Sequence, residues 1–303
     1  MAYLSDAFGL PPNVPFVDVD VDHDNRIFMD PSAIRNGSCY YSIQADARLI
    51  SFFGEVLRWR RSPDLAERSR GLDTLQRMRE PGQTRLGYSA RGTDGKGFGK
   101  GLGRMLWDAL GDPVCSDKAL HRIEHLPLFL DGVGKDLISD MVTRIVMDIL
   151  VDFTQEMMVS YPQLARETSI EAIMLWDPNT LEWVKRDVEL PYVGGKQLIL
   201  LPLGWVSDNL LMSDRPYYNR YTTRQEQLDL TTYDRDGNRD RPTKEAIKAD
   251  HPEVRTFNRN RTVQDLGKVA HIRLYQREVD ERFTPMDAAR IREHLNKALD
   301  EAS

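Results

Sequence analysis

The chain has 303 residues, of which 41% are hydrophobic and 29% are charged, and its formal net charge is −6. This is the composition of an ordinary globular protein, and the negative charge excludes binding to polyanions through global charge alone. No apolar run approaches the roughly 20 residues that span a bilayer, and two cysteines are too few for a disulfide framework. The first residues lack the basic and apolar regions of a secretory signal, so we expect a cytoplasmic protein without membrane partners.

The N-terminal quarter predicts a strand pair and two helices. Residues 16–24 alternate between apolar and acidic side chains, which is typical of a strand with one buried face, and a turn at 25–26 leads to a second strand at 27–29. Apolar side chains at helical spacing predict a helix over 42–61, and Ser62 followed by proline predicts the start of the next helix. The side chains expected to face inward on the first helix are Ile43, Ala47, Ile50, Phe53 and Leu57.

Residues 86–103, LGYSARGTDGKGFGKGLG, hold seven glycines among basic side chains. Glycine lets a ligand approach the main chain closely, and free N–H groups beside cations form a site for phosphate. The segment matches neither the P-loop nor the dinucleotide-binding fingerprint. We expect a loop that holds the phosphates of a larger ligand, although a flexible surface loop explains the same composition. Its candidate phosphate ligands are Arg85, Tyr88, Ser89, Arg91, Lys96 and Lys100.

The middle of the chain predicts a core helix and an antiparallel meander. A wide apolar stripe predicts the helix over 135–160. Turn residues separate the three strands expected in the meander, at 171–176, 183–192 and 197–206. The shorter elements expected before the core helix are two helices and a buried strand, over 102–110, 117–126 and 127–130.

Residues 213–261 form a polar excursion rich in arginine and tyrosine, and a capped helix is expected over 284–301. Arginine for phosphate and aromatic rings for base stacking are the pairing that nucleic-acid grooves use. A solvated stretch with internal ion pairs explains the same pattern. Together, the elements predict a helix-rich single α+β domain over residues 1–303, with a small N-terminal strand pair and an antiparallel meander.

Four carboxylates are the candidate catalytic residues. Asp18 and Asp20 lie on the polar face of the predicted strand, where carboxylate oxygens would suit a hard cation such as Mg²⁺. Asp136 and Asp140 lie one turn apart at the start of the predicted core helix. If the two pairs face each other, they would hold one Mg²⁺ ion or one water molecule. A solvated strand edge and a row of surface charges on the helix explain the same residues without a function.

The HxxEH pattern at His121, Glu124 and His125 predicts a different metal site. In zinc metallopeptidases with this pattern, the two histidines lie on a helix and bind Zn²⁺ while the glutamate activates water. Pro127 should end the helix two residues after His125, which weighs against a zinc site here.

Two segments, VDVDVDHDNRIFMDPSAI and DGVGKDLISDMVTRIVMDILVDFTQEM, resemble uncharacterised bacterial proteins of anti-phage defence loci. The resemblance implies a cytoplasmic bacterial protein that acts on phage nucleic acid. It implies no particular catalytic residue.

The leading hypothesis is a hydrolase that acts on nucleic acid, with DNA favoured over RNA, as a nuclease or a base-excising DNA glycosylase in antiviral defence. A nuclease would use Mg²⁺ to polarise phosphate and activate water, whereas a glycosylase needs only a carboxylate beside a flipped base. Two alternatives stay open, namely a zinc metallopeptidase built on the HxxEH pattern and a non-catalytic sensor that binds nucleic acid or nucleotides.

Overall fold

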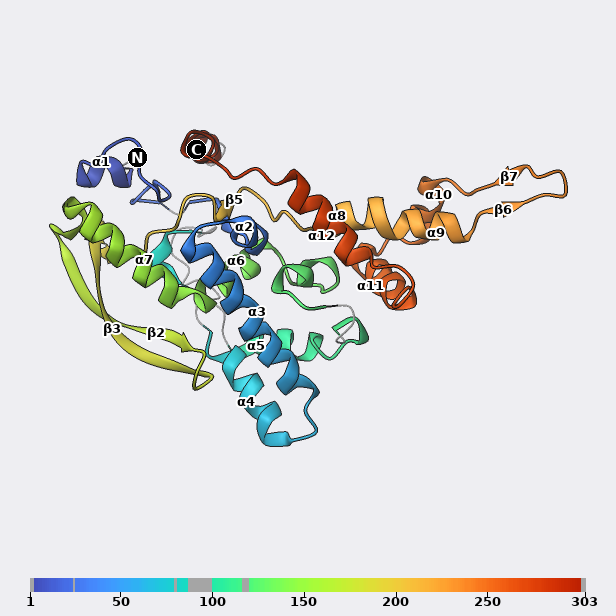
Figure 1. Ribbon diagram of the computed structural model, residues 1–303, viewed down its shortest axis with the longest axis horizontal. Helices are drawn as coiled ribbons and strands as arrows, with labels where there is room; N and C mark the ends of the chain where they lie inside the picture. The colour runs from blue at the N-terminus through green and yellow to red at the C-terminus, as the bar shows by residue number, and fades with distance from the viewer. Residues whose placement is uncertain (1–2, 24, 79–80, 87–99, 116–119, 301–303) are drawn as a thin grey trace.

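Helices dominate the protein and small antiparallel sheets complete it, so it is an α+β protein, as the sequence predicts. The computed structural model describes residues 3–23, 25–78, 81–86, 100–115 and 120–300 (Figure 1). Within these ranges, no helix is both long enough and apolar enough to cross a membrane.

The N-terminal strand pair joins segments that lie far apart in the chain. β1 (Phe28–Met29) pairs antiparallel with β5 (Val206–Ser207), so the predicted pairing of β1 with residues 16–24 is wrong. Residues 16–20 form isolated bridges instead of a strand. Their alternation still buries one set of side chains, because the extended segment lies against the core; these are Val17, Val19 and Val21.

The predicted helix after this segment forms, and its inward face agrees with the prediction in part. α3 (Tyr40–Arg61) buries Phe53 and Leu57 as predicted, but it also buries Leu49 and Phe52, whereas Ile43 and Ile50 are exposed. The buried residues of α3 pack against the central helices. The neighbouring helices are α1 (Leu4–Phe8), α2 (Pro31–Asn36), α4 (Leu65–Gln76) and α5 (Lys100–Ala109).

The core helix predicted over 135–160 forms as two consecutive helices. α6 (Lys135–Ile145) and α7 (Met147–Ser160) are separated by Val146, whose backbone leaves the helical region. Both helices contact α3, and their buried residues extend over most of their length, as the wide apolar stripe predicts.

The predicted meander is present beside these helices (Figure 1). β2 (Thr168–Asp177) and β3 (Glu182–Val193) pair along their whole length, and their end packs Trp176 against Trp183 with ring centroids 5.3 Å apart. The third strand is only β4 (Lys196–Gln197), because the buried residues after it leave the sheet and run through the core.

Residues 120–130 differ from their prediction. Neither a helix ending at 126 nor a strand at 127–130 forms there; residues 123–128 form one 3₁₀ helix, η3 (Ile123–Leu128), with Pro127 inside it. Proline supplies no N–H for an α-helical ladder, which accounts for the tighter and shorter turn. The other 3₁₀ helices are η1 (Gly82–Thr84), η2 (Pro113–Cys115) and η4 (Pro162–Ala165).

The polar segment after residue 213 is largely helical and carries an arm. The hairpin of β6 (Thr232–Tyr233) and β7 (Arg239–Asp240) projects from the body at the right of Figure 1. The helices before and after the hairpin are α8 (Asp214–Tyr217), the π-helical turn η5 (Tyr218–Thr222), α9 (Thr223–Asp229), α10 (Lys244–Asp250) and α11 (Val254–Gln264).

Two further helices return the chain to the body. α12 (His271–Arg282) crosses beside η3 and the arm, and α13 (Ala288–Asp300) ends near the N-terminus. Tyr3 donates a hydrogen bond of 2.6 Å to Asn296, which ties the two ends of the chain together. The last helix is capped, but it begins four residues later than predicted: Asp287, and not Thr284, accepts from the backbone N–H near its start, that of Arg290, at 2.8 Å.

Candidate anion-binding pocket

The two carboxylates predicted on the N-terminal strand each have protein partners of their own. Asp18 accepts hydrogen bonds from the backbone and hydroxyl of Ser5 and pairs with Arg292, so it joins α1 to α13. Asp20 is buried; it accepts from the backbone N–H of Asp22 at 2.9 Å, and its other oxygen lies 3.1 Å from Nδ1 of His23. These contacts identify Asp18 and Asp20 as structural residues.

Arg85, predicted to bind phosphate, is also a structural residue. It is buried, and its guanidinium donates to the backbone carbonyls of Val21 and Val193. Asn25 joins it to Asp20, because the Asn25 amide donates to the carbonyls of both residues, at 2.9 and 3.1 Å. The structure therefore brings Asp20 and Arg85 close together, but as parts of a turn rather than as a ligand site.

The remaining predicted residues do not form a metal site. Asp136 is exposed in the first turn of α6, and Asp140 is half-buried one turn later. Across the residues that the structure describes, no three His, Cys, Asp or Glu side chains are grouped to hold a metal ion. Lys100 is exposed at the start of α5, and the other predicted ligands of the glycine-rich loop lie outside the described residues; they are Tyr88, Ser89, Arg91 and Lys96.

The HxxEH residues do not adopt the predicted zinc geometry. His121 precedes the 3₁₀ helix that contains His125, so the two histidines do not share one face of an α-helix. Glu124 is buried and accepts a hydrogen bond of 2.8 Å from Arg35. Burial raises the pKa of Glu124 against the opposing effects of Arg35 and Arg122. This ion pair fixes η3 to α2 and leaves Glu124 no role as a base.

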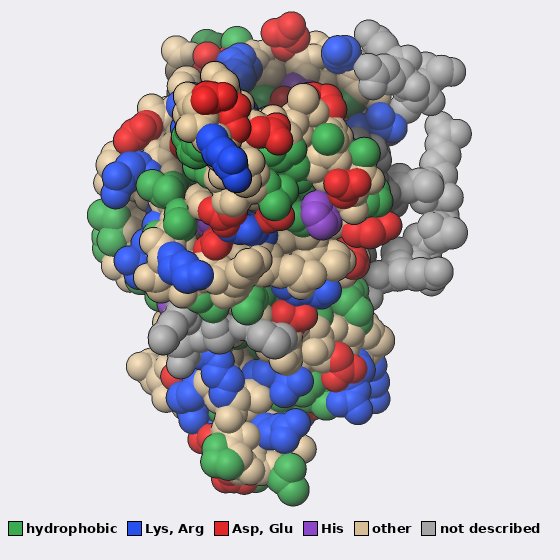
Figure 2. All heavy atoms as spheres, turned by 90° about the vertical axis from the view of Figure 1, so that its right-hand side faces the viewer, with side chains coloured by type: hydrophobic (Ala, Val, Ile, Leu, Met, Phe, Trp, Pro, Cys, Tyr) green, Lys and Arg blue, Asp and Glu red, His purple; other side chains and the backbone are tan. Residues whose placement is uncertain are grey.

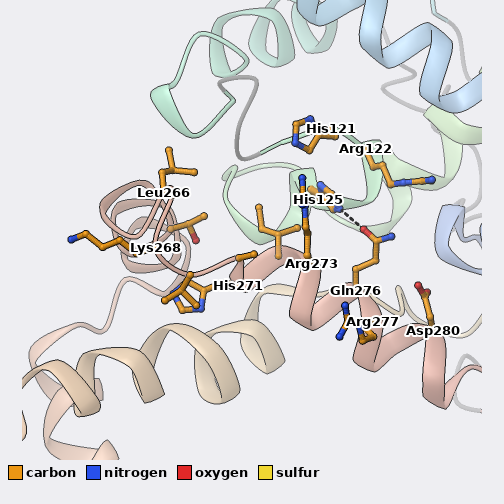
Figure 3. Close-up of a pocket in the computed structure, with 15 residues that line it drawn as sticks. His121, Arg122, His125, Leu266, Lys268, His271, Arg273, Gln276, Arg277 and Asp280 are labelled. Carbon is orange, nitrogen blue, oxygen red and sulfur yellow. Dashed lines mark hydrogen bonds between the residues drawn. The ribbon is translucent and has the colours of Figure 1, made fainter.

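His121 and His125 instead line a pocket (Figure 3). The pocket has a volume of about 810 Å³ and lies between η3 and the segment that joins α11 to α12. Gly267 turns the chain there with a φ of +83°, a conformation that glycine adopts without strain. The turn brings the N-terminus of α12 to the pocket wall.

The N-terminus of α12 is open toward this pocket. Its N-cap residue, Ala270, provides no side-chain hydrogen bond. Among the described residues, no acceptor bonds the first three backbone N–H groups of the helix, which belong to His271, Ile272 and Arg273. All four residues line the pocket. Unpaired N–H groups and the helix dipole both favour an anion at this position.

Three cations of the pocket form no salt bridge within the described residues: Lys268, which acts electrostatically on Asp229, and Arg273 and Arg277, for which no carboxylate partner is found there. All three are exposed at the pocket, and the spacing of Arg273 and Arg277 places them on one face of α12. Two other charged residues of the lining are neutralised within the protein, because Arg122 pairs with Asp46 and Asp280 pairs with Arg35. The uncompensated charge of the pocket is therefore positive.

Both histidines of the pocket, His121 just before η3 and His125 within it, have lowered pKa values, which favour the neutral imidazole. Burial lowers the pKa of His121, and Arg273 and Arg61 lower it further. Burial lowers the pKa of His125 to about 3, since its side chain is 2% exposed. Nε2 of His125 lies 3.4 Å from Oε1 of Gln276 on α12, whereas Nδ1 is buried without a hydrogen-bond partner.

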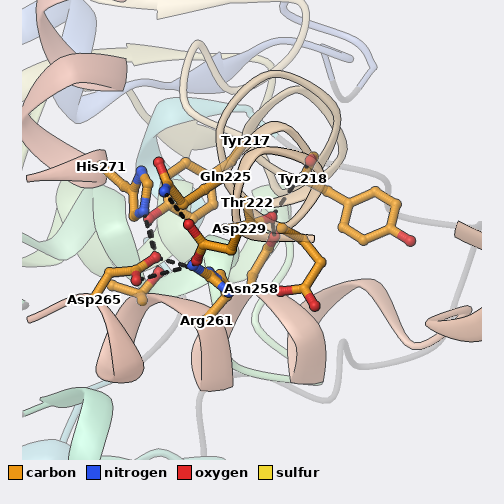
Figure 4. A network of polar contacts seen from close by, with 11 residues as sticks. Tyr217, Tyr218, Thr222, Gln225, Asp229, Asn258, Arg261, Asp265 and His271 are labelled. Carbon is orange, nitrogen blue, oxygen red and sulfur yellow. Dashed lines mark hydrogen bonds and ion pairs between the residues drawn. The ribbon is translucent and has the colours of Figure 1, made fainter. Parts of the chain in front are cut away.

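A buried polar network holds the other wall of the pocket (Figure 4). Arg261 of α11 donates to Glu226 and Asp229 of α9 and to Asp265. Asp265 also accepts from, or pairs with, Nε2 of His271 at 2.7 Å. This network ties α9, α11 and the start of α12 together, and it places an imidazole that is oriented by a carboxylate in the pocket lining.

The pocket adjoins a basic region of the surface. In Figure 2, Lys and Arg side chains gather on the lower lobe, where Figure 1 places the ends of α3 and α4. Apart from the buried Arg85, the described residues between 58 and 104 carry eight Lys and Arg and three Asp and Glu, and Arg58 and Arg77 among them pair with carboxylates. Arg61 at the end of α3 connects this region to the pocket, because it acts electrostatically on His121.

We did not predict the cations of the pocket, although the charge pattern of the sequence marks them. Residues 266–277 contain Lys268, Arg273 and Arg277 and no acidic residue. A run of this kind stands out in a chain with more acidic than basic side chains. The segment has mixed periodicity, and its relation to His121 and His125 depends on a contact between residues about 150 positions apart.

Comparison with known proteins places the chain among proteins whose function is not established. No solved structure matches it significantly. A family model, described as a domain of unknown function (DUF8370), matches residues 11–213, which are 203 of the 303 residues. The match includes His121 and His125 and ends before α12, which supplies the cations of the pocket. The chain therefore belongs to the DUF8370 family.

Proposed function

We propose that this protein binds nucleic acid and holds a backbone phosphate in the pocket at the N-terminus of α12. The observation that carries the proposal is the uncapped start of α12 beside Arg273 and Arg277, which have no carboxylate partner among the described residues. Phosphate oxygens would accept hydrogen bonds from the free N–H groups, and the cations and the helix dipole would both stabilise the negative charge.

The basic lobe favours a polymer over a small anion as the ligand. A single phosphate would occupy the start of α12 without contacting the excess of basic side chains on α3 to α5. A nucleic-acid strand carries a charge at each nucleotide, so it can contact Arg273 in the pocket and continue past Arg61 toward the lobe. We propose DNA as the first ligand to test, with RNA of the same sequence beside it.

Binding to fluorescently labelled single-stranded and double-stranded oligonucleotides, measured by anisotropy over a series of salt concentrations, tests this proposal. The double variant Arg273→Gln with Arg277→Gln removes two of the proposed contacts. For duplex DNA, the slope of log affinity against log salt should become shallower by about 2, since each lost phosphate contact contributes about 0.9.

The matched control removes the same charge elsewhere. Arg235→Gln with Arg239→Gln alters two exposed arginines of the β6–β7 hairpin, far from the pocket lining. The control should bind like the unmodified protein. Equal affinity and equal salt slope for the pocket variant and the control would refute the proposal, as would the absence of binding by the unmodified protein.

One observation favours a catalytic form of the same function. His271 lines the pocket, and its Nε2 side is held by Asp265 at 2.7 Å. In this arrangement, Asp265 would orient the imidazole through Nε2, while Nδ1 would be the atom left to take a proton from water. Hydrolysis would then depend on a histidine, not on the carboxylates that we predicted from the sequence.

Incubation of labelled DNA with the protein, with and without EDTA and followed by alkali, distinguishes these outcomes. Nicks that survive EDTA, appear without alkali and disappear in His271→Gln would support the histidine route. Nicks that appear only after alkali would indicate base excision. Cleavage that EDTA abolishes would exclude a metal-independent route through His271, and retarded but intact DNA would leave a binding protein.

A further inference from the structure

We propose that the α12 pocket receives one unpaired nucleotide, with the base against its inner wall and the phosphate at the start of α12. This inference rests on the proposed function and specifies its ligand. A nucleotide flipped from a duplex, or one in a single strand, would meet this description, whereas a paired duplex backbone would not.

One ring nitrogen of His125, Nδ1, has no hydrogen-bond partner within the protein. As the Gln276 side chain is oriented, its carbonyl oxygen faces Nε2 of His125 at 3.4 Å, so Nε2 must carry the proton. A neutral imidazole has only one N–H, and therefore Nδ1 presents a lone pair. This lone pair is buried and has no donor within the protein. A ligand that supplies a donor would remove the cost of leaving it unpaired.

Phosphate cannot supply that donor. A phosphodiester has no hydroxyl, so all of its free oxygens are acceptors, and they would repel the lone pair of Nδ1. The N–H groups on the edge of a nucleobase are donors of the required kind. The N–H groups at the start of α12 and the Nδ1 atom of His125 thus favour chemically different parts of one ligand.

The apolar part of the pocket lining fits the base of such a ligand better than its phosphate. Aliphatic side chains from the turn before α12 and its first residues form part of the wall; these are Leu266, Val269, Ala270 and Ile272. Such a surface packs against a base and gains nothing from a phosphate. The volume of about 810 Å³ lies within the range of pockets that enclose a small organic ligand.

The spacing along α12 places the two parts within reach of one nucleotide. Arg273 lies in the first turn, and Gln276, which contacts His125, lies three residues later on the same face. Three residues advance about 4.5 Å along a helix axis. Figure 3 shows Arg273 and His125 beside each other between η3 and α12.

Titration calorimetry with small ligands tests the inference on the full chain. The ligands are inorganic phosphate, deoxyribose 5-phosphate, and the 5′-monophosphates of deoxyadenosine and deoxycytidine, whose bases carry amino groups. At least one nucleotide should bind about tenfold or more tightly than inorganic phosphate and the sugar phosphate, as expected for a buried acceptor that gains a donor. Equal affinity of the nucleotides and the two base-free ligands would overturn the inference.

Two variants of His125 separate its role from a purely structural one. His125→Phe should lower nucleotide affinity to that of inorganic phosphate and leave phosphate affinity unchanged. His125→Asn keeps an acceptor oxygen near the position of Nδ1 and should restore most of the preference. An unchanged preference for nucleotides in a folded His125→Phe protein would contradict the role of Nδ1.

The apolar wall provides a test that does not depend on how well the His125 variants fold. Leu266→Asn alters the half-buried wall without changing charge, and it should weaken nucleotide binding but not phosphate binding. Leu274→Asn is the matched control, because Leu274 is an exposed leucine of α12 outside the pocket lining. Similar nucleotide affinities of the two variants would refute base contact with this wall.

The outcomes distinguish this inference from the function on which it rests. If oligonucleotides bind through Arg273 and Arg277 but nucleotides bind no better than inorganic phosphate, the inference fails and the proposed function stands. If the Arg273→Gln with Arg277→Gln variant binds oligonucleotides normally, both fail.

Discussion

Replacement of His125 should make the protein less sensitive to acid. The pKa of this histidine is lowered to about 3 by burial, whereas a histidine in the unfolded chain has a pKa of about 6.5. Between these values the unfolded chain binds a proton that the native protein excludes. Acid therefore favours unfolding, and the stability that neutral His125 allows is present above about pH 6.5 and lost progressively toward pH 3.

The size of this effect follows from the two pKa values. At about pH 5, proton binding by the unfolded histidine lowers the free energy of unfolding by about 2 kcal/mol relative to about pH 7.5. No discount for solvent is required, because the side chain is only 2% exposed. His125→Phe removes the titrating group and should remove this part of the acid sensitivity.

Urea unfolding of the unmodified protein and of His125→Phe, followed by tryptophan fluorescence at about pH 7.5, 6 and 5, measures the difference. Because the substitution also changes the absolute stability, the quantity compared is the change in the free energy of unfolding between the first and last pH. That change should be smaller by about 2 kcal/mol in the variant. Parallel pH profiles would refute the reasoning, since they would mean that native His125 protonates as readily as the unfolded residue.

Three further substitutions test the contacts that hold the site. Arg261→Met should cost about 3–5 kcal/mol in urea unfolding, because it leaves buried Asp265 without its cation, whereas Arg220→Met breaks an exposed pair and should cost less than about 1 kcal/mol. Leu49→Ala should cost about 2–5 kcal/mol and Ile50→Ala less than about 0.5 kcal/mol; the reverse order would show that the inward face of α3 is the one predicted from its sequence. Asp287→Ala should lower stability by about 1 kcal/mol through the lost cap of α13, and an unchanged thermal midpoint would exclude that role for Asp287.

Elements with strong local signals were predictable. The apolar stripe of α6 and α7 and the paired strands β2 and β3 follow from periodicity and turn residues, which depend only on neighbours in the chain. The inward face of α3 was not predictable in the same way. Ile43 and Leu49 are equally apolar, and only the position of the packed core decides which of the two is buried.

The sequence correctly marked His121 and His125 as unusual, but for a chemistry that the fold does not support. A motif is defined by spacing, and the same spacing gives a different geometry in a 3₁₀ helix than in an α-helix. The catalytic role of the carboxylates stays a prediction. Alternation can place Asp18 and Asp20 on one face, but it cannot show that Arg292 and His23 already occupy their oxygens.

By itself, the sequence determined the α+β class, the central apolar helices and the meander, because these depend on the order of apolar and polar residues along short segments. Only the tertiary structure decided where the candidate site lies. It brought His125 against Gln276, left Arg273 and Arg277 without a carboxylate partner among the described residues, and opened the start of α12 toward a pocket. The physical reason is that an anion site depends on which charges remain uncompensated after folding, and the compensating partners lie far away along the chain.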